Sequence, residues 1–372
     1  MNKRDMKIQK ILLLAILAGM ASTASAQFQK SILKEFQQNS KFGGYIIGKY
    51  DYNDKEGTDA NGGFDLRLGR VYVDGKVQNF NYKLQIEVSG TPNTANTTEK
   101  IARIVDAYAE WEKYPFAKIK FGQFKRAFTF ENPYNPFDVG FNSNAQVVSK
   151  LSGMADRTGE HSSGGRDLGI QLQGDFAKMA DGHNLIHYQV MVANGQGINH
   201  SDVNKTKDVI GTIQFVPIKN LYIGAFGWTG NYTKNGVTVD RNRMAFGFKY
   251  ESDWTFRGEY ATSQGHKISD YTLDEEEGVY KVTKNVGKDK ADGWYLTVGA
   301  PVAKGLKIYG KWDVYRDYKS NESATSQYTL SANYYLNKNL KIQGTFYHTH
   351  TGKEVAGDHD FNTVDVQLYW RF

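Results

Sequence analysis

The last twelve residues of the chain, positions 361–372, alternate between apolar and polar side chains. Counting back from the terminal residue, every second side chain is apolar: Phe372, Trp370, Leu368, Val366 and Val364. A period of two is the signature of a β-strand. One face of this strand suits hydrocarbon and the other suits water, and its aromatic end suits a membrane interface. A chain of modest overall hydrophobicity is therefore a candidate for a membrane protein built of strands.

The first 26 residues have the composition of a signal peptide. A basic region is followed by the apolar run 11–18 and by the small residues Ala24, Ser25 and Ala26. This order is typical of an export signal that is cleaved after a small residue. The apolar run is too short to cross a bilayer, and no other run of about 18 apolar residues follows it. We therefore expect an exported chain that begins near Gln27 and has no transmembrane helix.

Composition and charge exclude several other classes of protein. The chain has no Cys, so no disulfide can hold it together. Its formal charge of +6 falls to 42 − 39 = +3 once the four basic residues and one acidic residue of positions 1–26 are removed. A charge this small on an exported chain does not favour nucleic acid as a partner. Strands that are apolar on one face only have a polar average, so the hydropathy fits a membrane barrel.

Sixteen segments of the mature chain have strand character, and an even number is typical of transmembrane barrels. Their predicted ranges are 42–51, 63–73, 80–90, 102–112, 117–124, 166–176, 185–194, 208–217, 221–230, 240–251, 253–262, 291–300, 304–314, 325–336, 338–349 and 361–372. On the segment 253–262, for example, the apolar set Trp254, Phe256 and Tyr260 alternates with Thr255, Arg257 and Glu259. We expect the apolar sets to face lipid and the charged sets to face the lumen.

The connectors between these segments alternate between short and long. Most of the short ones have one to six residues, and the long, polar ones are 52–62, 91–101, 125–165, 195–207, 231–239, 263–290, 315–324 and 350–360. Short periplasmic turns and long extracellular loops are typical of an up-and-down barrel, and an open sheet edge is not tolerated in lipid. The sequence therefore predicts an all-β fold, a transmembrane antiparallel barrel over residues 42–372, after a short periplasmic segment, 27–41.

Several motifs in the first half of the chain point to a family. They are 67–75 (RLGRVYVDG), 81–85 (NYKLQ), 105–108 (VDAY), 122–125 (GQFK) and 165–172 (GRDLGIQL). In order and spacing they resemble the phosphate-selective porin O/P family, whose members are sixteen-stranded, often trimeric, anion-selective outer-membrane channels. A final strand ending in Phe also resembles the closing strand of bacterial outer-membrane barrels. The resemblance implies that Phe372 and Trp370 form an assembly signal for the barrel-assembly machinery.

The longest connector, 125–165, lies between the fifth and sixth strands, where the resemblance implies a loop that folds inward and narrows the channel. Forty-one irregular residues in a compact domain suggest a functional element. We expect Lys125, Arg126, Arg157 and Arg166 to present cations to the constriction. The alternative is that such cations pair with loop or wall carboxylates and hold the loop in place.

Basic residues also fall on the lumen faces of the predicted strands, where they outnumber the acidic residues. The candidates for a basic lumen wall are Arg67, Arg70, Lys83, Lys118, Lys120, Arg241, Arg243, Lys249, Arg257, Lys307, Lys311, Lys341 and Arg371. Such a lumen would attract small anions such as phosphate and chloride. Arg70 breaks the alternation of its strand, so either a bulge turns it inward or it extends to a membrane interface.

The sequence thus predicts a water-filled, anion-preferring channel for small solutes, with phosphate or polyphosphate among the candidates. It would lie in the outer membrane of a Gram-negative bacterium, in contact with lipid and lipopolysaccharide, and the resemblance allows a homotrimer. A general non-specific pore and a surface scaffold or adhesin that uses loops 125–165 and 263–290 are the alternatives. An outer-membrane enzyme is disfavoured, because the histidines are scattered over loops and strands without carboxylates at ligand spacing. We expect neither a cofactor, nor a metal, nor catalytic residues.

Overall fold

The computed structural model of the protein describes residues 26–56, 62–88, 102–274, 276–282 and 289–372. The predicted signal peptide lies outside the described residues except for Ala26, and so does the predicted loop 91–101. Parts of the predicted loops 52–62 and 263–290 also lie outside them.

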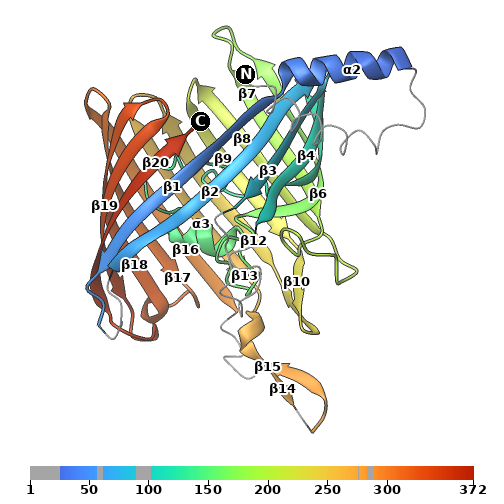
Figure 1. The fold of residues 1–372 in the computed structure, drawn as a ribbon. Coiled ribbons are helices and arrows are strands. Elements are labelled where there is room, and N and C mark those ends of the chain that lie inside the picture. Colours follow the sequence, from blue (N-terminus) through green and yellow to red (C-terminus); the bar gives the residue numbers. More distant parts are fainter. Residues whose placement is uncertain (1–25, 57–61, 89–101, 275, 283–288) are drawn as a thin grey trace.

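Sixteen antiparallel strands form one closed barrel (Figure 1), which confirms the predicted fold class. Each strand pairs with its neighbour along the chain, and the last pairs with the first, so no edge is open. The strands are β1 (Lys41–Asn53), β2 (Gly62–Val77), β3 (Phe80–Glu87), β4 (Arg103–Tyr114), β5 (Ala117–Lys125), β6 (Arg166–Lys178), β7 (Asn184–Ala193), β8 (Asp208–Ile218), β9 (Leu221–Thr229), β12 (Asn242–Glu251), β13 (Thr255–Gln264), β16 (Lys290–Ala303), β17 (Leu306–Arg316), β18 (Ala324–Asn337), β19 (Leu340–Thr351) and β20 (Asp360–Arg371).

The two faces of the strands have opposite chemistry. On β20 the apolar residues Val364, Val366, Leu368 and Trp370 are 43–50 % exposed, whereas the alternate residues Asp365, Gln367 and Tyr369 are at most 3 % exposed. Exposed apolar and buried polar side chains are the reverse of a soluble protein. The arrangement is expected of a barrel whose outer face lies in lipid and whose polar residues face inward.

The long connectors contain secondary structure that the sequence analysis treated as loop. Strands β10 (Asn231–Lys234) and β11 (Val237–Asp240) form a hairpin, and so do β14 (Tyr271–Asp274) and β15 (Val279–Val282). Both hairpins extend from the end of the barrel opposite to the C-terminus (Figure 1). Two short 3-10 helices, η1 (Ile268–Asp270) and η2 (Asn321–Ser323), also lie in these connectors. Because Asp240 belongs to the hairpin, β12 begins two residues later than predicted.

Helix α2 (Ala26–Asn39) precedes the barrel and is longer than the one or two turns predicted over residues 30–39. It lies at the same end of the barrel as the C-terminus (Figure 1). The ring of Phe36 stacks on that of Tyr82 with centroids 4.8 Å apart, and the Ser40 hydroxyl lies 2.6 Å from the Tyr82 hydroxyl. No helix among the described residues is both long enough and apolar enough to cross a membrane.

Candidate functional site: the barrel lumen and the segment between β5 and β6

The segment 126–165, which connects β5 to β6, makes hydrogen bonds to strands far away in the sequence. The amides of Phe130 and Glu131 donate to the Glu259 carboxylate on β13, at 2.6 and 3.1 Å. The Gln146 amide, at the start of helix α3 (Gln146–Leu151), donates to Asp313 on β17 at 2.8 Å. These wall carboxylates accept backbone N–H groups, so the segment and the wall satisfy each other's buried polar groups.

Basic side chains of the wall bind the carbonyl groups of the same segment. Lys341 on β19 donates to the carbonyl of Phe137, and Arg257 on β13 donates to that of Val139, both at 2.8 Å. The guanidinium of Arg371 lies 4.2 Å from the centre of the Phe137 ring. Lys341 and Arg257 are thus attachment points for the segment 126–165.

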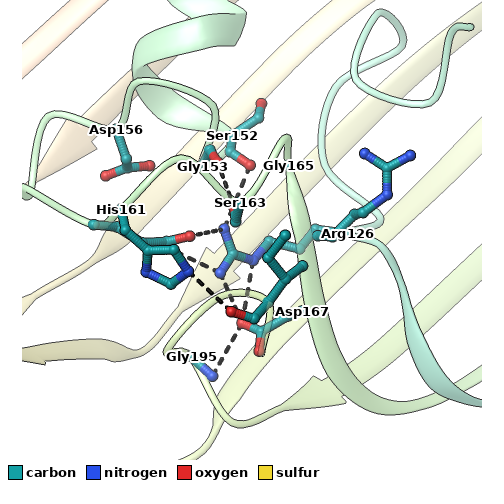
Figure 2. A network of polar contacts seen from close by, with 12 residues as sticks. Arg126, Ser152, Gly153, Asp156, His161, Ser163, Gly165, Asp167 and Gly195 are labelled. Atoms are coloured by element: carbon teal, nitrogen blue, oxygen red, sulfur yellow. Dashed lines mark hydrogen bonds and ion pairs between the residues drawn. The ribbon is translucent and has the colours of Figure 1, made fainter. Parts of the chain in front are cut away.

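A buried ion network holds the second half of the segment. Arg126 donates to Glu160 at 3.0 and 3.1 Å and to Asp167 on β6 at 2.7 and 3.2 Å, and Figure 2 shows Arg126 beside Asp167. Arg241 donates to Glu160 and, at 2.6 Å, to Asp208 on β8. These five side chains are at most 1 % exposed. Because each charge faces an opposite one, their burial is compensated.

Arg243 and Asp156 form another buried ion pair beside this network. Arg243 donates two hydrogen bonds of 2.7 Å to Asp156. Burial alone would raise the pKa of Asp156, but the charge and hydrogen bonds of Arg243 outweigh it and hold that pKa well below its usual range. The guanidinium groups of Arg126, Arg241 and Arg243 all lie 4.6–4.8 Å from the ring centre of Trp228. Cation–π contacts of this kind add to the ion pairs.

The remaining constriction candidates occupy different places. Arg157 is also buried: it donates to the carbonyl of Gly265 and lies 3.6 Å from the Asp317 carboxylate. Arg166 pairs with Asp106 on β4 at 2.7 Å. Lys125 has a weaker contact, 3.5 Å from its Nζ to the side-chain oxygen of Asn132. The structure therefore places Arg126 and Arg157 among the ion pairs that hold the segment, as the alternative interpretation expects.

An irregular cavity of about 600 Å³ lies between the segment and the opposite wall of the barrel. The wall side comes mainly from β2 to β8, and residues 127–136 form part of the other side. Nine basic residues line it against two acidic ones, Glu87 and Asp106; the basic ones are Arg67, Arg70, Lys83, Arg103, Lys120, Lys125, Arg126, Arg166 and Lys249.

Four of these cations form no ion pair within the described residues: Arg67, which donates to the side chains of Gln367 and Tyr369, and three lysines. Lys83 lies 5.2 Å from the Tyr72 ring centre, and Lys249 lies 4.7 Å from that of Tyr222. Lys125 has only its contact with Asn132. By contrast, Glu87 binds both Arg70 and Arg103, and Lys120 lies 3.6 Å from Glu110. The cavity therefore carries an excess of positive charge.

A second cavity of about 780 Å³ lies next to the first, toward helix α2. Four residues line both: Tyr45, Lys83, Tyr108 and Asn135. Gln38 and Asn39 of α2 and Arg371 of β20 also line it. The two cavities thus follow one another along the wall formed by β1 to β5.

The structure contains the bulge that was one of two alternatives for Arg70. The register between β1 and β2 shifts at Ile47 and Gly48, which pair with Leu68 and Leu66, so Arg67 is the extra residue. Beyond the bulge, Arg70 is 8 % exposed and binds Glu87 at 2.5 and 2.8 Å. Arg67 itself donates to the side chains of Gln367 and Tyr369.

The other predicted wall residues lie away from the 600 Å³ cavity. Lys118 pairs with Asp175 at 3.2 Å, Lys311 lies 3.7 Å from Asp313, and Lys307 donates to a turn carbonyl at 3.4 Å. Sequence reasoning missed Arg103, because a bulge between β3 and β4 reverses the alternation beside it. Within the part of the chain that the structure describes, no group of three or more His, Cys, Asp or Glu residues could hold a metal ion.

Comparison with known proteins gives the family. The family model of the Gram-negative porins matches residues 13–354. No curated protein matches the chain. Solved structures that resemble it include the anion-selective porin from Comamonas acidovorans (13 % identity, TM-score 0.63, 90 % of this chain and 99 % of that one) and OmpF of Salmonella typhi (11 %, 0.62, 90 % and 98 %). The trimer form of OmpT, an outer membrane protein of Vibrio cholerae, is a third (12 %, 0.56, 90 % and 99 %).

At these identities the structural matches show the fold alone, whereas the family match covers most of the chain. Family and fold indicate the outer membrane, and they point to a channel rather than an enzyme. The chain belongs to the Gram-negative porin family.

Proposed function

We propose that the protein is an outer-membrane diffusion channel that prefers small anions, phosphate and chloride among them. The observation that carries the proposal is the lining of the 600 Å³ cavity, where nine basic residues face two acidic ones. In a narrow passage with walls of low dielectric constant, an excess of cations raises the local concentration of anions and repels cations.

The segment 126–165 is, in this proposal, the constriction of the channel. Its attachments to β13, β17 and β19 would hold it against one side of the lumen, which leaves the side formed mainly by β2 to β8 for solutes. Lys83, Lys125 and Lys249 are the candidates for guiding anions past it, because they have no carboxylate partner among the described residues. Arg166 would contribute a field reduced by its pairing with Asp106.

The proposal has four further parts. Residues 1–26 would direct export, and Phe372 and Trp370 would form the assembly signal. The barrel would contact lipid and lipopolysaccharide, and three copies would form a homotrimer. The trimer is supported by the trimer form of one structural neighbour. An anion preference is supported by the name of another, the anion-selective porin. Selectivity for phosphate is supported by the motifs around Arg67, Arg70, Lys125 and Arg166, which resemble those of the phosphate-selective porins.

A planar-bilayer measurement tests the preference. In a KCl gradient the reversal potential should show that Cl⁻ permeates faster than K⁺. Replacing Lys83, Lys125 and Lys249 together by Gln should lower the Cl⁻/K⁺ permeability ratio several-fold. The matched control replaces three exposed lysines outside both cavities, Lys205, Lys219 and Lys353, by Gln and should leave the ratio unchanged.

A reversal potential of cation sign would overturn the anion preference. A value near zero in the unaltered protein would reduce the proposal to a general pore. A permeability ratio that falls as much in the control as in the lumen variant would show that the overall charge, and not the cavity, sets the preference.

A further inference from the structure

We propose that the 600 Å³ cavity binds hydroxylated organic anions, such as sugar phosphates and sugar acids, in preference to inorganic anions. This inference rests on the proposed channel function and adds a class of solute to it. Three groups of residues in the cavity lining carry it: unpaired cations, side-chain amides with free hydrogen-bonding capacity, and aromatic rings.

The cations provide for the anionic group of such a solute. Lys83, Lys125 and Lys249 lack ion-pair partners among the described residues. Arg166 also lines the cavity, although it is paired with Asp106. A phosphate or carboxylate accepts charge-assisted hydrogen bonds from such groups. Cations alone, however, would not distinguish an organic anion from an inorganic one.

The amides provide for hydroxyl groups. Gln85 on β3, Gln171 on β6 and Gln214 on β8 all line the cavity. Within the described residues, Gln85 and Gln214 make no side-chain hydrogen bond. Gln171 is 3 % exposed; its amide nitrogen donates to Gln173 at 2.6 Å, but its oxygen has no partner. A buried unpaired acceptor costs free energy that a hydroxyl donor can recover.

A hydroxyl group both donates and accepts hydrogen bonds, and an amide side chain offers it an acceptor oxygen and two N–H donors. Chloride offers neither a donor nor a shape that could reach several amides at once. A ring with several hydroxyls can bind amides on neighbouring strands while its anionic group remains at a lysine. The amides therefore favour a polyhydroxylated solute over a simple ion.

The aromatic residues provide for the apolar face of a ring. Tyr108 and Phe124 lie edge to face with centroids 6.1 Å apart, and the Lys120 amine is 4.9 Å from the Tyr108 ring centre. Phe130 and Phe226 line the cavity from the other side, also edge to face, at 5.0 Å. Phe124, Phe130 and Phe226 are only 3–5 % exposed and belong to the buried cluster against which the partly buried Tyr108 packs. In this proposal the ring of Tyr108 therefore covers the C–H surface of a sugar ring, which a small inorganic ion does not present.

The cavity volume also fits a solute of this size, since sites for small molecules usually enclose about 300–1,000 Å³. The second cavity shares four lining residues with this one, and in this proposal a bound solute would move on into that neighbouring cavity. Weak binding at several sites is what facilitated diffusion requires.

Current block in planar bilayers tests this inference with three probes: glucose 6-phosphate, inorganic phosphate and glucose. Glucose 6-phosphate should reach half-block at a concentration about tenfold lower than inorganic phosphate, because it gains several weak hydrogen bonds. Glucose, which lacks the anionic group, should block still less. Equal half-block concentrations for glucose 6-phosphate and phosphate would overturn the inference.

Substitution of the amides tests the site itself. Gln171→Met keeps the side-chain length but removes the amide, and it should reduce the advantage of glucose 6-phosphate over inorganic phosphate about threefold. Gln327→Met is the matched control, because Gln327 lies on β18 outside both cavities. An undiminished advantage in a triple variant of Gln85, Gln171 and Gln214 would also overturn the inference.

The reversal potential in KCl alone, measured in the same bilayers, keeps the two proposals apart. A channel that prefers Cl⁻ but does not favour glucose 6-phosphate over phosphate contradicts only the sugar-anion inference. A channel that prefers K⁺ contradicts the proposed function on which that inference rests.

Discussion

Arg126→Met is the substitution that most directly tests the attachment of the segment 126–165. The guanidinium is fully buried and donates four hydrogen bonds to Glu160 and Asp167. Removing one partner of a buried ion pair costs about 3–5 kcal/mol, because the other charge is left without compensation. Here Glu160 keeps Arg241, and Asp167 keeps the Gly195 amide at 3.1 Å. We therefore expect the lower part of that range.

A loss of about 3 kcal/mol shifts the equilibrium between attached and detached segment by roughly 150-fold, since 1.4 kcal/mol is tenfold. The sixteen-stranded ladder does not depend on this contact, so the barrel should stay closed. We expect larger and noisier single-channel currents, with the gel mobility of a folded barrel unchanged before heating. Arg316→Met is the control: Arg316 pairs with Asp292 on the neighbouring strand, at 2.6 Å, and among the described residues it has no hydrogen bond or ion pair to the segment.

A second variant separates loss of attachment from loss of folding. Adding Glu160→Gln and Asp167→Asn to Arg126→Met removes the two carboxylates that lose their partner, while Arg241 keeps Asp208. Replacing both sides of a buried ion pair by neutral groups is often near neutral for stability. The single-channel current of the triple variant should therefore be less noisy than that of Arg126→Met and closer to that of the unaltered protein. Currents of Arg126→Met that match those of the unaltered protein, in size and in noise, would refute the reasoning.

Three further predictions concern selectivity, the lipid face and closure. Lys125→Glu should lower the Cl⁻/K⁺ permeability ratio more than Lys125→Gln, as read from the reversal potential, because it adds an anion to the cavity. Leu368→Arg should destabilise the barrel by ~2–4 kcal/mol if Leu368 lies near the bilayer midplane, measured by denaturant unfolding from liposomes. Deleting Phe372 should lower the yield of folded barrel, scored by gel mobility, since its backbone makes two 3.0 Å hydrogen bonds to Gly44 that extend the β1–β20 pairing.

The sixteen strands could be predicted because alternation is a local property of the sequence. Each strand faces lipid on one side and water on the other, so the period of two survives wherever no bulge interrupts it, and β20 shows it from Thr363 to Trp370. The two extra hairpins lie within segments that were predicted as loops, and each of their strands has only four residues, too few to show a clear period. Asn235 and Gly236, both with positive φ, form the turn of one, and an Asn-Gly pair is a recognised hairpin signal.

The roles of the basic residues could not be read from the sequence, because pairing depends on register and on the path of the segment 126–165. Arg241 and Lys83 both fall in predicted strands and look equivalent, yet Arg241 is bound to Glu160 and Asp208, and Lys83 has no ion pair among the described residues. Bulges add a second difficulty, since one extra residue reverses the face of all that follow. For this reason the sequence leaves the direction of the Arg70 side chain open and does not identify Arg103 as a lumen residue.

The most direct test of the account is the reversal potential of the purified, unaltered protein in a KCl gradient, with the Lys83, Lys125 and Lys249→Gln variant beside it. We predict that Cl⁻ permeates faster than K⁺ and that the variant loses most of this preference. A preference for K⁺, or a Cl⁻ preference that persists at full strength in the variant, would contradict the claim that the cations of the 600 Å³ cavity select the solute.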